Sequence, residues 1–513
     1  MNIERIRQPF IENFPGDFSN NPMQRNTPKV LFSTIKPAGF GQPELVAFNE
    51  VLSEEIGLGK FEDKDLDFLV GNNLPENVQT YATAYAGHQF GNWAGQLGDG
   101  RAILAGEITN EAGKKTEIQW KGAGATPYSR HADGRAVLRS SVREYLMSEA
   151  MHHLGVPTTR ALSLAFTGED VMRDIMYSGN PQLEKGAVVI RTAESFLRFG
   201  HFEMMSAQRE YNSLQELADF TIENYFQEIE SSDIQKYKDF FQNICTRTAD
   251  LMVEWFRVGF VHGVMNTDNM SVLGLTIDYG PYSMMDEYDL NFTPNTTDLP
   301  GRRYAFGKQG QIAQWNLWQL ANALHPLIKD EKFLEDTLNN FGTYFWKAHD
   351  QMLCKKFGFD QLQKEDEDFF TNWQGLMQEL QLDYTLFFTQ LEKITPETDI
   401  KEHFKEVSYI VLNEEMLAKL SNFIKSYEAR LGLNSISRET SLDIMKKANP
   451  KFILRNYLLY ECIEEINNGK KEMLEKLTKA LESPYQELYP ELSVKRPSGY
   501  DDTAGCSTLS CSS

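Results

Sequence analysis

The stretch from Gly259 to Asp286 constrains this chain more than any other part of its sequence. Asp268 and Asn269 stand side by side in it, and Asp278 follows nine residues after Asn269, in the triplet Asp-Tyr-Gly. The mostly apolar run 270–277 between them predicts a tight hairpin flanked by two loops. Mg²⁺ prefers oxygen ligands and is usually held by one or two carboxylates together with substrate phosphates. The stretch therefore predicts three oxygen-bearing side chains at one end of a hairpin, where such a cation can bind.

The spacing of these residues matches a protein-kinase catalytic loop, in which His-Arg-Asp precedes an Asn and Asp-Phe-Gly follows. His262 and Asn269 occupy the outer positions of the first motif, and Asp278 begins the second. The position of the kinase base is Val264, which cannot accept a proton, whereas Asp268 supplies an acid directly before Asn269. A simple polar turn is the alternative, because Asp and Asn are turn formers. The Asp-Asn pair alone favours the turn, and the whole constellation favours a phosphate and metal site.

Composition indicates a globular protein without a nucleic-acid partner. The chain has 513 residues, of which 41% are hydrophobic and 24% charged, enough for one large core or a few smaller ones. Its net charge of −22 lacks the basic footprint that nucleic acid requires, but leaves room for a local basic pocket. No stretch has the length and apolarity of a membrane helix, and the N-terminus lacks the apolar core of a signal peptide. We therefore expect a cytoplasmic protein with no membrane partner.

The first part of the chain carries a Gly-rich segment and a strand that ends in lysine. Residues 1–60 are interrupted by prolines and predict an irregular extension. The segment 85–108 predicts either β-hairpin turns or a backbone that approaches phosphates closely. Its positions of most interest are Gly98, Asp99, Gly100 and Arg101. A strand over 116–121 ends at Lys121, which is either a solvated surface residue or the strand lysine that kinases place on nucleotide phosphates.

A helix is predicted from about Ser141 to Leu154, because Gly155 and a proline stop it. Ser141 and Glu144 fit a capping box, in which the two side chains satisfy the first turn of a helix. Glu144 has a second interpretation as the partner of Lys121, since kinases pair their strand lysine with a helix glutamate. The sequence by itself favours the cap.

Two arginines follow the next predicted strand. Arg191 ends this strand, and Arg198 comes seven residues later. If the segment between them is helical, both lie on one face. They would then form a polyphosphate clamp, because guanidinium groups bind phosphate oxygens in pairs. Surface ion pairs with Glu194 and Glu203 are an equal alternative.

The rest of the chain is predicted to be mostly helical. Apolar residues of helical period run over 234–258, a loop rich in Pro, Asn and Thr occupies 291–301, and helices with acidic faces run from about 333 to 481. The end of the chain, from Ser498 onward, is polar and predicted to be mobile. Three cysteines fall in apolar helical contexts and are expected in the core: Cys245, Cys354 and Cys462.

The sequence resembles the selenoprotein O family in five segments: HGVMNTDN, IDYGPYSMMDEYD, YAGHQFGNWAGQLGDGRA, IQWKGAG and NPKFILRNYLL. The resemblance runs from about residue 30 to the terminal Cys-Ser-Ser. It implies an α+β, bilobal protein-kinase-like fold, with an N-terminal extension and N-lobe over 1–205, a C-lobe over 206–345 and a helical C-terminal extension over 346–513. It also implies transfer of AMP from ATP, bound in an orientation flipped relative to kinases, to Ser, Thr or Tyr hydroxyls of proteins. Pyrophosphate is the second product, and Mg²⁺ or Mn²⁺ is the implied cofactor.

The same resemblance implies roles for single positions. Asp268 matches the proton acceptor of the family, and Asn269 and Asp278 match its metal ligands. Lys121 and Glu144 match the catalytic lysine and its partner. The positions that match nucleotide contacts are Gly98, Gly100, Arg101, Lys121, Asp133, Gly134, Arg191, Arg198 and Asp278. An acid next to the metal would accept the proton of an incoming hydroxyl, while the cations offset charge on the departing pyrophosphate.

The tail departs from the family pattern. Family members often carry a cysteine three residues before the one near the terminus, and that position is Thr508 here. The nearest partner of Cys511 is Cys506, five residues away. A redox pair between Cys506 and Cys511, a pairing of Cys511 with another segment and a reduced thiol all stay open.

Three functions are compatible with the sequence. The first is AMP transfer to proteins, with UMP transfer from UTP and Mn²⁺ as its variant in bacterial relatives of the resembled family. The second is a conventional γ-phosphoryl kinase, which Val264 disfavours. The third is a catalytically silent nucleotide-binding scaffold.

Overall fold

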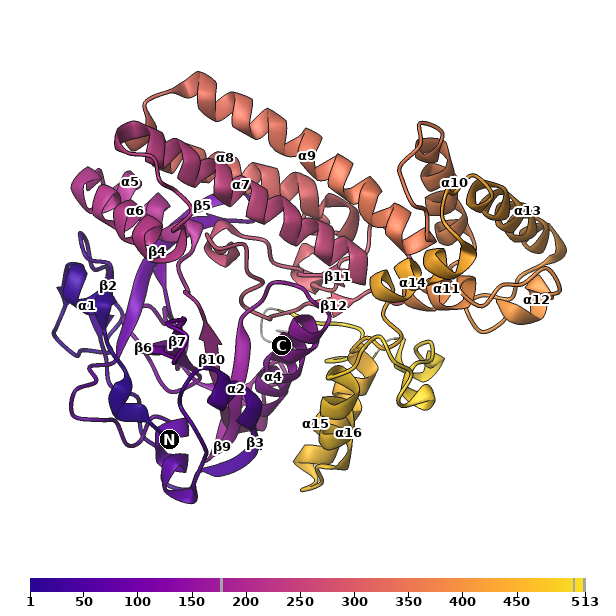
Figure 1. The fold of residues 1–513 in the computed structure, drawn as a ribbon. Coiled ribbons are helices and arrows are strands. Elements are labelled where there is room, and N and C mark those ends of the chain that lie inside the picture. The colour runs from indigo at the N-terminus through magenta and orange to yellow at the C-terminus, as the bar shows by residue number, and fades with distance from the viewer. Residues whose placement is uncertain (176–178, 502, 511–513) are drawn as a thin grey trace.

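The computed structural model describes residues 1–175, 179–501 and 503–510 of the chain. Within these ranges a ten-stranded sheet forms the N-terminal part and helices form the rest, so the predicted α+β class is confirmed (Figure 1). The strands of the sheet are β1 (Gly16–Asp17), β2 (Phe32–Thr34), β3 (Glu44–Phe48), β4 (Tyr81–Gln89), β5 (Asn92–Gly98), β6 (Ala102–Thr109), β7 (Lys115–Lys121), β8 (Ala136–Val137), β9 (Arg160–Arg173) and β10 (Gln182–Ala193). A separate pair consists of β11 (Phe260–Val261) and β12 (Ser283–Met284).

The sheet places the end of β7 at its centre. Its strand order is β1-β2-β4-β6-β7-β10-β9-β3, with β5 paired to β4 and β8 to β10, and only the β1–β2 pair is parallel among the described strands. Along β7, Ile118 and Trp120 are fully buried on one face, as their alternation predicts. Lys121 is paired on both sides, with Ala102 of β6 and Val189 of β10. The surface-lysine interpretation is therefore wrong, because Lys121 leaves the sheet between two neighbours and is buried.

Two acids lie opposite each other on neighbouring strands of the sheet, and they make the stability of the protein depend on pH. Glu117 of β7 lies opposite Glu107 of β6, and burial raises the pKa of Glu117 to about 8. The folded protein therefore keeps this proton up to about pH 8, whereas the unfolded chain loses it near the ordinary value of 4.5. Stability should fall as pH rises through this window, because the unfolded state binds fewer protons there.

We expect Glu117→Gln to remove this decrease of the free energy of unfolding with pH. At pH 8 the variant should unfold with a free energy higher than that of wild type by about 4 kcal/mol at most. Urea titrations from pH 5 to 8 measure the free energy of unfolding, with Glu397→Gln at an exposed position as the matched control. Equal slopes for wild type and Glu117→Gln would contradict the assignment.

Helix α4 (Leu138–His153) packs on β9 and β10 and begins three residues before the predicted start. Ser141 is buried inside the helix and its hydroxyl has no hydrogen-bond partner, so the capping box is wrong. The chain needs no side-chain cap at this point, because Val137 enters the helix from β8, which is already paired to β10. Glu144 is thereby free to turn toward Lys121.

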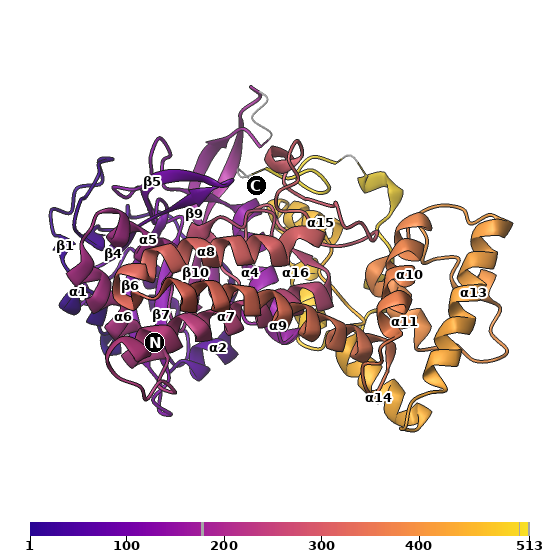
Figure 2. The same cartoon turned by 90° about the horizontal axis from the view of Figure 1, so that it is seen from above.

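Five helices follow the sheet: α5 (Phe199–Ala207), α6 (Tyr211–Tyr225), α7 (Asp233–Val258), α8 (Gln309–Ile328) and α9 (Glu331–Phe357). Helices α7, α8 and α9 lie side by side, and α5 connects them to the sheet through contacts with β4 and α8 (Figures 1 and 2). Helix α7 confirms the predicted stripe over 234–258 and ends at Gly259, whose left-handed φ of 75° turns the chain into β11. No helix in the described ranges is long and apolar enough to cross a membrane.

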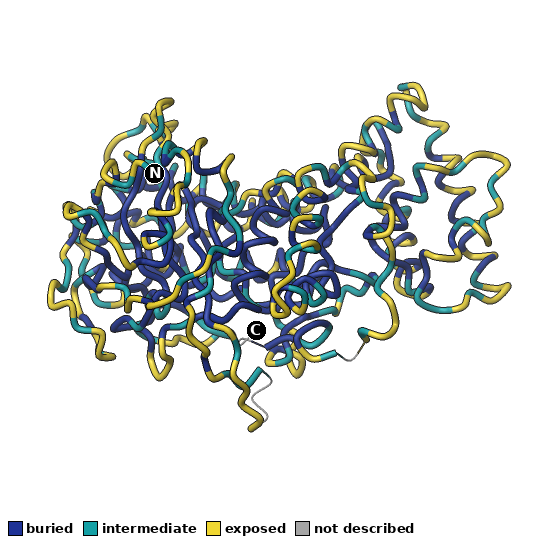
Figure 3. The backbone as a smooth tube through the Cα atoms, turned by 90° about the horizontal axis from the view of Figure 1, so that it is seen from below, coloured by how far each residue is buried: buried dark blue, intermediate teal, exposed yellow. Residues whose placement is uncertain are grey.

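The last third of the chain is helical, as predicted. Its helices are α10 (Asp366–Glu379), α11 (Tyr384–Leu391), α12 (Ile400–His403), α13 (Glu414–Leu431), α14 (Arg438–Ala448), α15 (Asn456–Asn467) and α16 (Glu472–Leu481). The group α10–α14 projects from the main body at the end of α9, and α15 and α16 return to pack on α4 (Figures 1 and 2). Figure 3 shows buried residues concentrated inside the main body, with exposed loops around it. The three cysteines expected in the core are buried: Cys245, Cys354 and Cys462.

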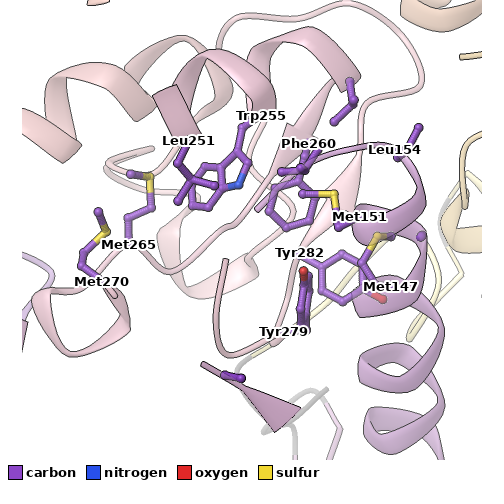
Figure 4. Close-up of a cluster of buried hydrophobic side chains, with 14 of the residues drawn as sticks. Met147, Met151, Leu154, Leu251, Trp255, Phe260, Met265, Met270, Tyr279 and Tyr282 are labelled. Atoms are coloured by element: carbon purple, nitrogen blue, oxygen red, sulfur yellow. The ribbon is translucent and has the colours of Figure 1, made fainter. Parts of the chain in front are cut away.

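A cluster of buried side chains joins α4 to the segment that carries Asp278 (Figure 4). Tyr282 is its centre: its hydroxyl donates to the carbonyl of Arg143 at 2.7 Å, and Arg143 returns a 2.7 Å bond to the Tyr282 carbonyl. The Arg143 guanidinium also lies over the Tyr282 ring, 4.3 Å from its centroid. The Phe260 ring stacks on the Tyr282 ring, with 5.8 Å between the ring centroids. The residues after Asp278 are therefore fixed to the helix that carries Glu144.

Two local predictions are wrong. Residues 1–60 are not merely irregular, because β2 and β3 lie in the sheet and Phe32 is fully buried. The run 270–277 contains no hairpin strands: Ser271 bridges to Arg198, and Thr276 bridges to Thr158. The apolar Met270 and Val272 form backbone hydrogen bonds with the segment at the start of α5 and are buried. Other parts of the chain thus bury them better than a two-stranded hairpin could.

The tail is packed, in contrast to the predicted mobility. Residues 503–510 lie against the body, and Cys506 and Leu509 have no exposed surface. The Leu509 carbonyl accepts the N–H of Thr296 at 2.8 Å. Burial raises the pKa of the Cys506 thiol to about 11. Cys511 lies outside the described residues, so the Cys506–Cys511 pairing stays a prediction.

Candidate functional site

A cavity of about 930 Å³ opens between the sheet and the loop that follows α7, a volume in the range of small-molecule sites. Its lining includes these predicted site residues: Gly98, Gly100, Arg101, Lys121, Asp133, Gly134, Arg191, Arg198, Asp268, Asn269 and Asp278. Glu144 lies directly behind Lys121, and Cys506 is not part of the lining. Residues from four separate stretches of sequence thus meet at one place.

The turn between β5 and β6 presents bare backbone to the cavity. A Cβ on Gly98 would lie 2.4 Å from the Tyr128 ring and 2.7 Å from the Thr83 carbonyl, and one on Gly100 would lie 2.9 Å from the Tyr128 carbonyl. Between them, the buried Asp99 carboxylate accepts the N–H and the hydroxyl of Thr83, at 3.0 and 2.6 Å. Residues 98 and 100 must therefore be glycines, and their backbone borders the cavity, where phosphates can approach. The β-hairpin that this segment predicts is formed by β4 and β5.

Lys121 forms a buried ion pair with Glu144 of α4. Arg191 of β10 binds the other oxygen of Glu144 at 2.9 Å. Burial lowers the pKa of Lys121 to about 8, and the two cations hold the pKa of Glu144 below its ordinary value against the opposing effect of burial. Glu144 therefore positions both cations toward the cavity, the arrangement that the kinase interpretation predicted.

Asp278 lies among three cations. Arg191 donates to its Oδ1 at 2.6 Å, Arg198 donates to its Oδ2, and the Lys121 ammonium lies 4.0 Å from Oδ1. Although burial alone would raise it, the pKa of Asp278 lies well below its ordinary value because of Arg198, Arg191 and Lys121. Asp278 also adopts a left-handed φ of 58°, which directs the chain sharply at this point. A permanently ionised carboxylate thus faces the cavity at its most cationic wall.

The two arginines meet here by a different route from the predicted one. Arg191 lies in β10, and Arg198 precedes α5 in extended conformation, so the segment between them is not helical. Surface ion pairs with Glu194 and Glu203 are also wrong, because both guanidinium groups are buried. Glu203 binds His88 instead, at 2.6 Å. The Nε atoms of both arginines are buried without a partner.

Asp268 has one free carboxylate oxygen. It lies in the short 3-10 helix η3 (Thr267–Asn269), where Gln89 of β4 donates to its Oδ2 at 3.3 Å. Its Oδ1 is buried and has no hydrogen-bond partner. Burial, opposed by Arg198, raises the pKa of Asp268 to about 6. The Oδ1 atom packs close to Gly87, where a Cβ would lie 3.1 Å from it. Buried acceptors are rarely left unsatisfied, so the Asp268 carboxylate keeps an unused capacity to accept a hydrogen bond.

Asp133 and Gly134 form part of the rim. The Asp133 carboxylate binds both terminal nitrogens of Arg173 at 2.8 Å. A Cβ on Gly134 would lie 2.2 Å from the Gly124 carbonyl, so no side chain fits there. Both positions therefore fix a loop whose backbone borders the cavity.

Gln89 is a site residue that the sequence did not reveal. A glutamine inside a Gly-rich strand carries no motif, and the hydrogen bond to Asp268 joins residues 179 positions apart. The sequence signal nearest to it is Gly87, where a Cβ would lie 3.1 Å from the Asp268 amide. A glycine in a strand often marks such a close approach of another backbone.

Comparison with known proteins gives this cavity its context. The family model described as Protein adenylyltransferase SelO matches residues 17–482. This chain belongs to the SelO/YdiU family. Relatives named protein nucleotidyltransferase YdiU occur in Cytophaga hutchinsonii, 47% identical over 514 residues and covering 99% of both chains, and in Flavobacterium johnsoniae, 42% identical over 519 residues and again covering 99% of both. Another in Nitrosospira multiformis is 43% identical over 548 residues, covering 99% of this chain and 96% of the relative.

As a SelO/YdiU family member, the chain is a nucleotidyltransferase, which implies a nucleoside triphosphate substrate and a divalent cation. The residues present fit such a cation. Asn269 donates its side-chain N–H to the Val264 carbonyl at 2.9 Å, which leaves its amide oxygen available as a ligand. The ionised Asp278 supplies carboxylate oxygens in the same cavity. No cluster of three His, Cys, Asp or Glu side chains suited to a metal occurs in the described part of the chain, so phosphates and water would complete the shell.

Proposed function

We propose that this SelO/YdiU enzyme transfers AMP from ATP to Ser, Thr or Tyr hydroxyls of proteins and releases pyrophosphate. The observation that carries the proposal is the unpartnered Oδ1 of Asp268, next to Asn269 and in one cavity with Asp278. A hydroxyl donor in the cavity can approach the Asp268 carboxylate while the triphosphate lies against the cationic wall formed by Lys121 and Arg191.

The reaction then balances as a single displacement. The acceptor hydroxyl oxygen forms a bond to the α-phosphorus, the bond from that phosphorus to the β-bridging oxygen breaks, and pyrophosphate leaves with the electron pair. Asp268 accepts the hydroxyl proton on its carboxylate. Lys121, Arg191 and Arg198 stabilise the growing negative charge on pyrophosphate, since bidentate guanidinium groups suit phosphate oxygens. A Mg²⁺ or Mn²⁺ ion held by Asn269 and Asp278 would add charge stabilisation when bound.

The proposal includes a kinase-like organisation of the chain. The Lys121–Glu144 ion pair, between a central strand and a helix packed on the sheet, supports it. Under this view residues 1–205 contain the N-lobe with its extension, 206–345 the C-lobe and 346–513 the helical C-terminal extension. Val264 borders the cavity where a kinase has its catalytic acid, and this disfavours γ-phosphoryl transfer.

The test is to follow label from ATP carrying it at the α- or the γ-phosphate, with intact-mass analysis of the enzyme and of candidate substrate proteins. We expect α-label on protein and a mass increment of one AMP, lost in Asp278→Ala. UTP run in parallel, with Mg²⁺ or Mn²⁺, decides between AMP and UMP transfer. Label from the γ-position would indicate a kinase, and nucleotide binding without any transfer would indicate a scaffold.

Removal of divalent cations should stop transfer while nucleotide still binds weakly. The reason is that Lys121, Arg191 and Arg198 remain to hold phosphates after chelation. We expect transfer to fall at least about a hundredfold with EDTA and to return on addition of Mg²⁺ or Mn²⁺. Calorimetric titration with ATP measures binding in both states. Full transfer in EDTA would contradict the assignment of Asn269 and Asp278 as ligands.

A further inference from the structure

Four side chains form a surface next to the Asp268 side of the cavity, here called the acceptor patch: His88, Trp93, Arg303 and Trp315. His88 lies edge-on to Trp93 and to Trp315, with ring centroids 5.0 and 5.5 Å apart. The Arg303 guanidinium lies over the Trp315 ring, 4.6 Å from its centroid. His88 and Trp93 come from the β4–β5 hairpin and Trp315 from α8, which lie close together in Figures 1 and 2. The acceptor patch therefore contains residues from both the sheet and the helical part of the molecule.

The acceptor patch is continuous with the catalytic loop. The His88 N–H donates to the Thr267 hydroxyl at 2.7 Å, one residue before Asp268. The next residue, Gln89, holds Asp268 itself, and both Gln89 and Phe90 line the cavity. A polypeptide lying on the patch would thus enter the cavity beside Gln89 and Asp268.

Arg303 is a guanidinium without an acidic partner. No carboxylate lies within 4.0 Å of it in the described ranges, although acids outnumber bases 73 to 51 in the sequence. Its Nε is buried and makes no hydrogen bond. Two acids lie near the patch among the described residues, and both are buried and already bound. Glu203 binds His88, and Asp298 accepts the backbone N–H groups of Arg303 and Tyr304. A half-buried guanidinium stacked on an indole is an efficient binding group for a carboxylate.

The aromatic members give the patch the composition of a binding hot spot. Trp93 is 46% exposed, and Trp318, one turn after Trp315 on α8, is 52% exposed. Tryptophan and arginine dominate hot spots at protein interfaces, whereas an isolated exposed aromatic needs no explanation. Here the exposed Trp93 is connected through His88 to the Trp315 ring on which Arg303 is stacked.

We propose that the acceptor patch binds the peptide segment that carries the acceptor hydroxyl, and that Arg303 selects segments with an acidic side chain near that hydroxyl. An apolar side chain of the segment lies on Trp93 and Trp315, while its carboxylate pairs with Arg303. This inference rests on the proposed transfer to protein hydroxyls and adds the substrate class to it. The nucleotide does not require the patch, because its phosphates have the cationic wall of Lys121, Arg191 and Arg198.

The experiment uses the full-length enzyme and a set of peptides with one acceptor hydroxyl, in which a single aspartate or a single lysine steps through the neighbouring positions. Transfer is measured with α-labelled ATP as kcat/KM for each peptide. We expect wild type to prefer an aspartate over a lysine by at least about tenfold at one position. Arg303→Glu should reverse the preference at that same position, with ATP affinity unchanged.

Two further variants protect the result against misfolding and nonspecific charge effects. Trp93→Ser alters an exposed side chain and should raise KM for every peptide without changing ATP affinity. Lys425→Glu makes the same change of charge on the exposed side of α13 and should leave the preference as in wild type.

Each failure has a distinct meaning. Wild type that labels aspartate and lysine peptides equally would overturn the acceptor patch while leaving the proposed function intact, and so would Arg303→Glu that keeps the wild-type preference. Wild type that binds ATP but labels no peptide or protein would overturn the proposed function and this inference with it.

Discussion

Asp268→Asn is expected to lose transfer by about a hundred- to ten-thousandfold, the usual contribution of a general base. The substitution keeps the size of the side chain but replaces the carboxylate that receives the proton. Arg198 donates to the backbone carbonyl of Asp268 at 2.9 Å, and the substitution leaves this carbonyl in place. ATP affinity should therefore change little. Rates with α-labelled ATP and calorimetric binding measure the two quantities separately.

The exposed Asp443→Asn serves as the matched control, because it removes the same charge far from the cavity on α14. It should leave transfer unchanged. Near-normal transfer by Asp268→Asn would contradict its role as proton acceptor, whereas loss of ATP binding in parallel would show that it acts on the nucleotide site instead.

Asp278→Asn should lose activity to a similar extent and also lose stability. Its carboxylate compensates two buried guanidinium groups and faces the Lys121 ammonium. Breaking such a pair leaves buried cations without a counter-charge, and we expect the free energy of unfolding to fall by about 3 kcal/mol. Urea denaturation measures this loss.

The same variant should respond to pyrophosphate in an unusual way. Without metal, pyrophosphate should stabilise Asp278→Asn more than wild type, because Arg191 and Arg198 are then free to bind it. Asp383→Asn is the matched control, since it removes another buried carboxylate, paired with Arg455 and outside the cavity. It should lose stability without gaining any response to pyrophosphate. Equal responses in all three proteins would argue against the assignment of Arg191 and Arg198 to phosphate.

The residues that sequence brought to attention were those whose chemistry is unusual for their local context. Asp268, Asn269 and Asp278 share a recognisable spacing, and Lys121 ends a strand whose alternation is plain, so their placement in one cavity could be predicted. Predictions from local sequence patterns were wrong where strand pairing elsewhere in the fold determines the structure. Ser141 reads as a helix cap, but the pairing of β8 with β10 starts the helix three residues earlier.

Other contacts had no local signal at all. Arg191 and Arg198 converge because a strand and an extended segment bring them to Asp278, which helical spacing alone does not suggest. Gln89 gains its role only through Asp268, 179 residues away. Arg303 gains its role by stacking on Trp315, which no local motif indicates. The packing of residues 503–510 likewise depends on hydrogen bonds to Thr296 and Ile175. A polar tail sequence does not indicate these contacts.

The end of β4 is tied to the catalytic loop at several points. Phe90 donates its N–H to the Tyr304 hydroxyl and to the Asn266 side chain, and the Tyr304 hydroxyl in turn donates to Asn266. These hydrogen bonds join the sheet to the helical part of the molecule beside the cavity. A wide hinge opening would have to break all these bonds at once, so we expect substrates to enter and products to leave through small rearrangements of rim side chains around a preassembled centre.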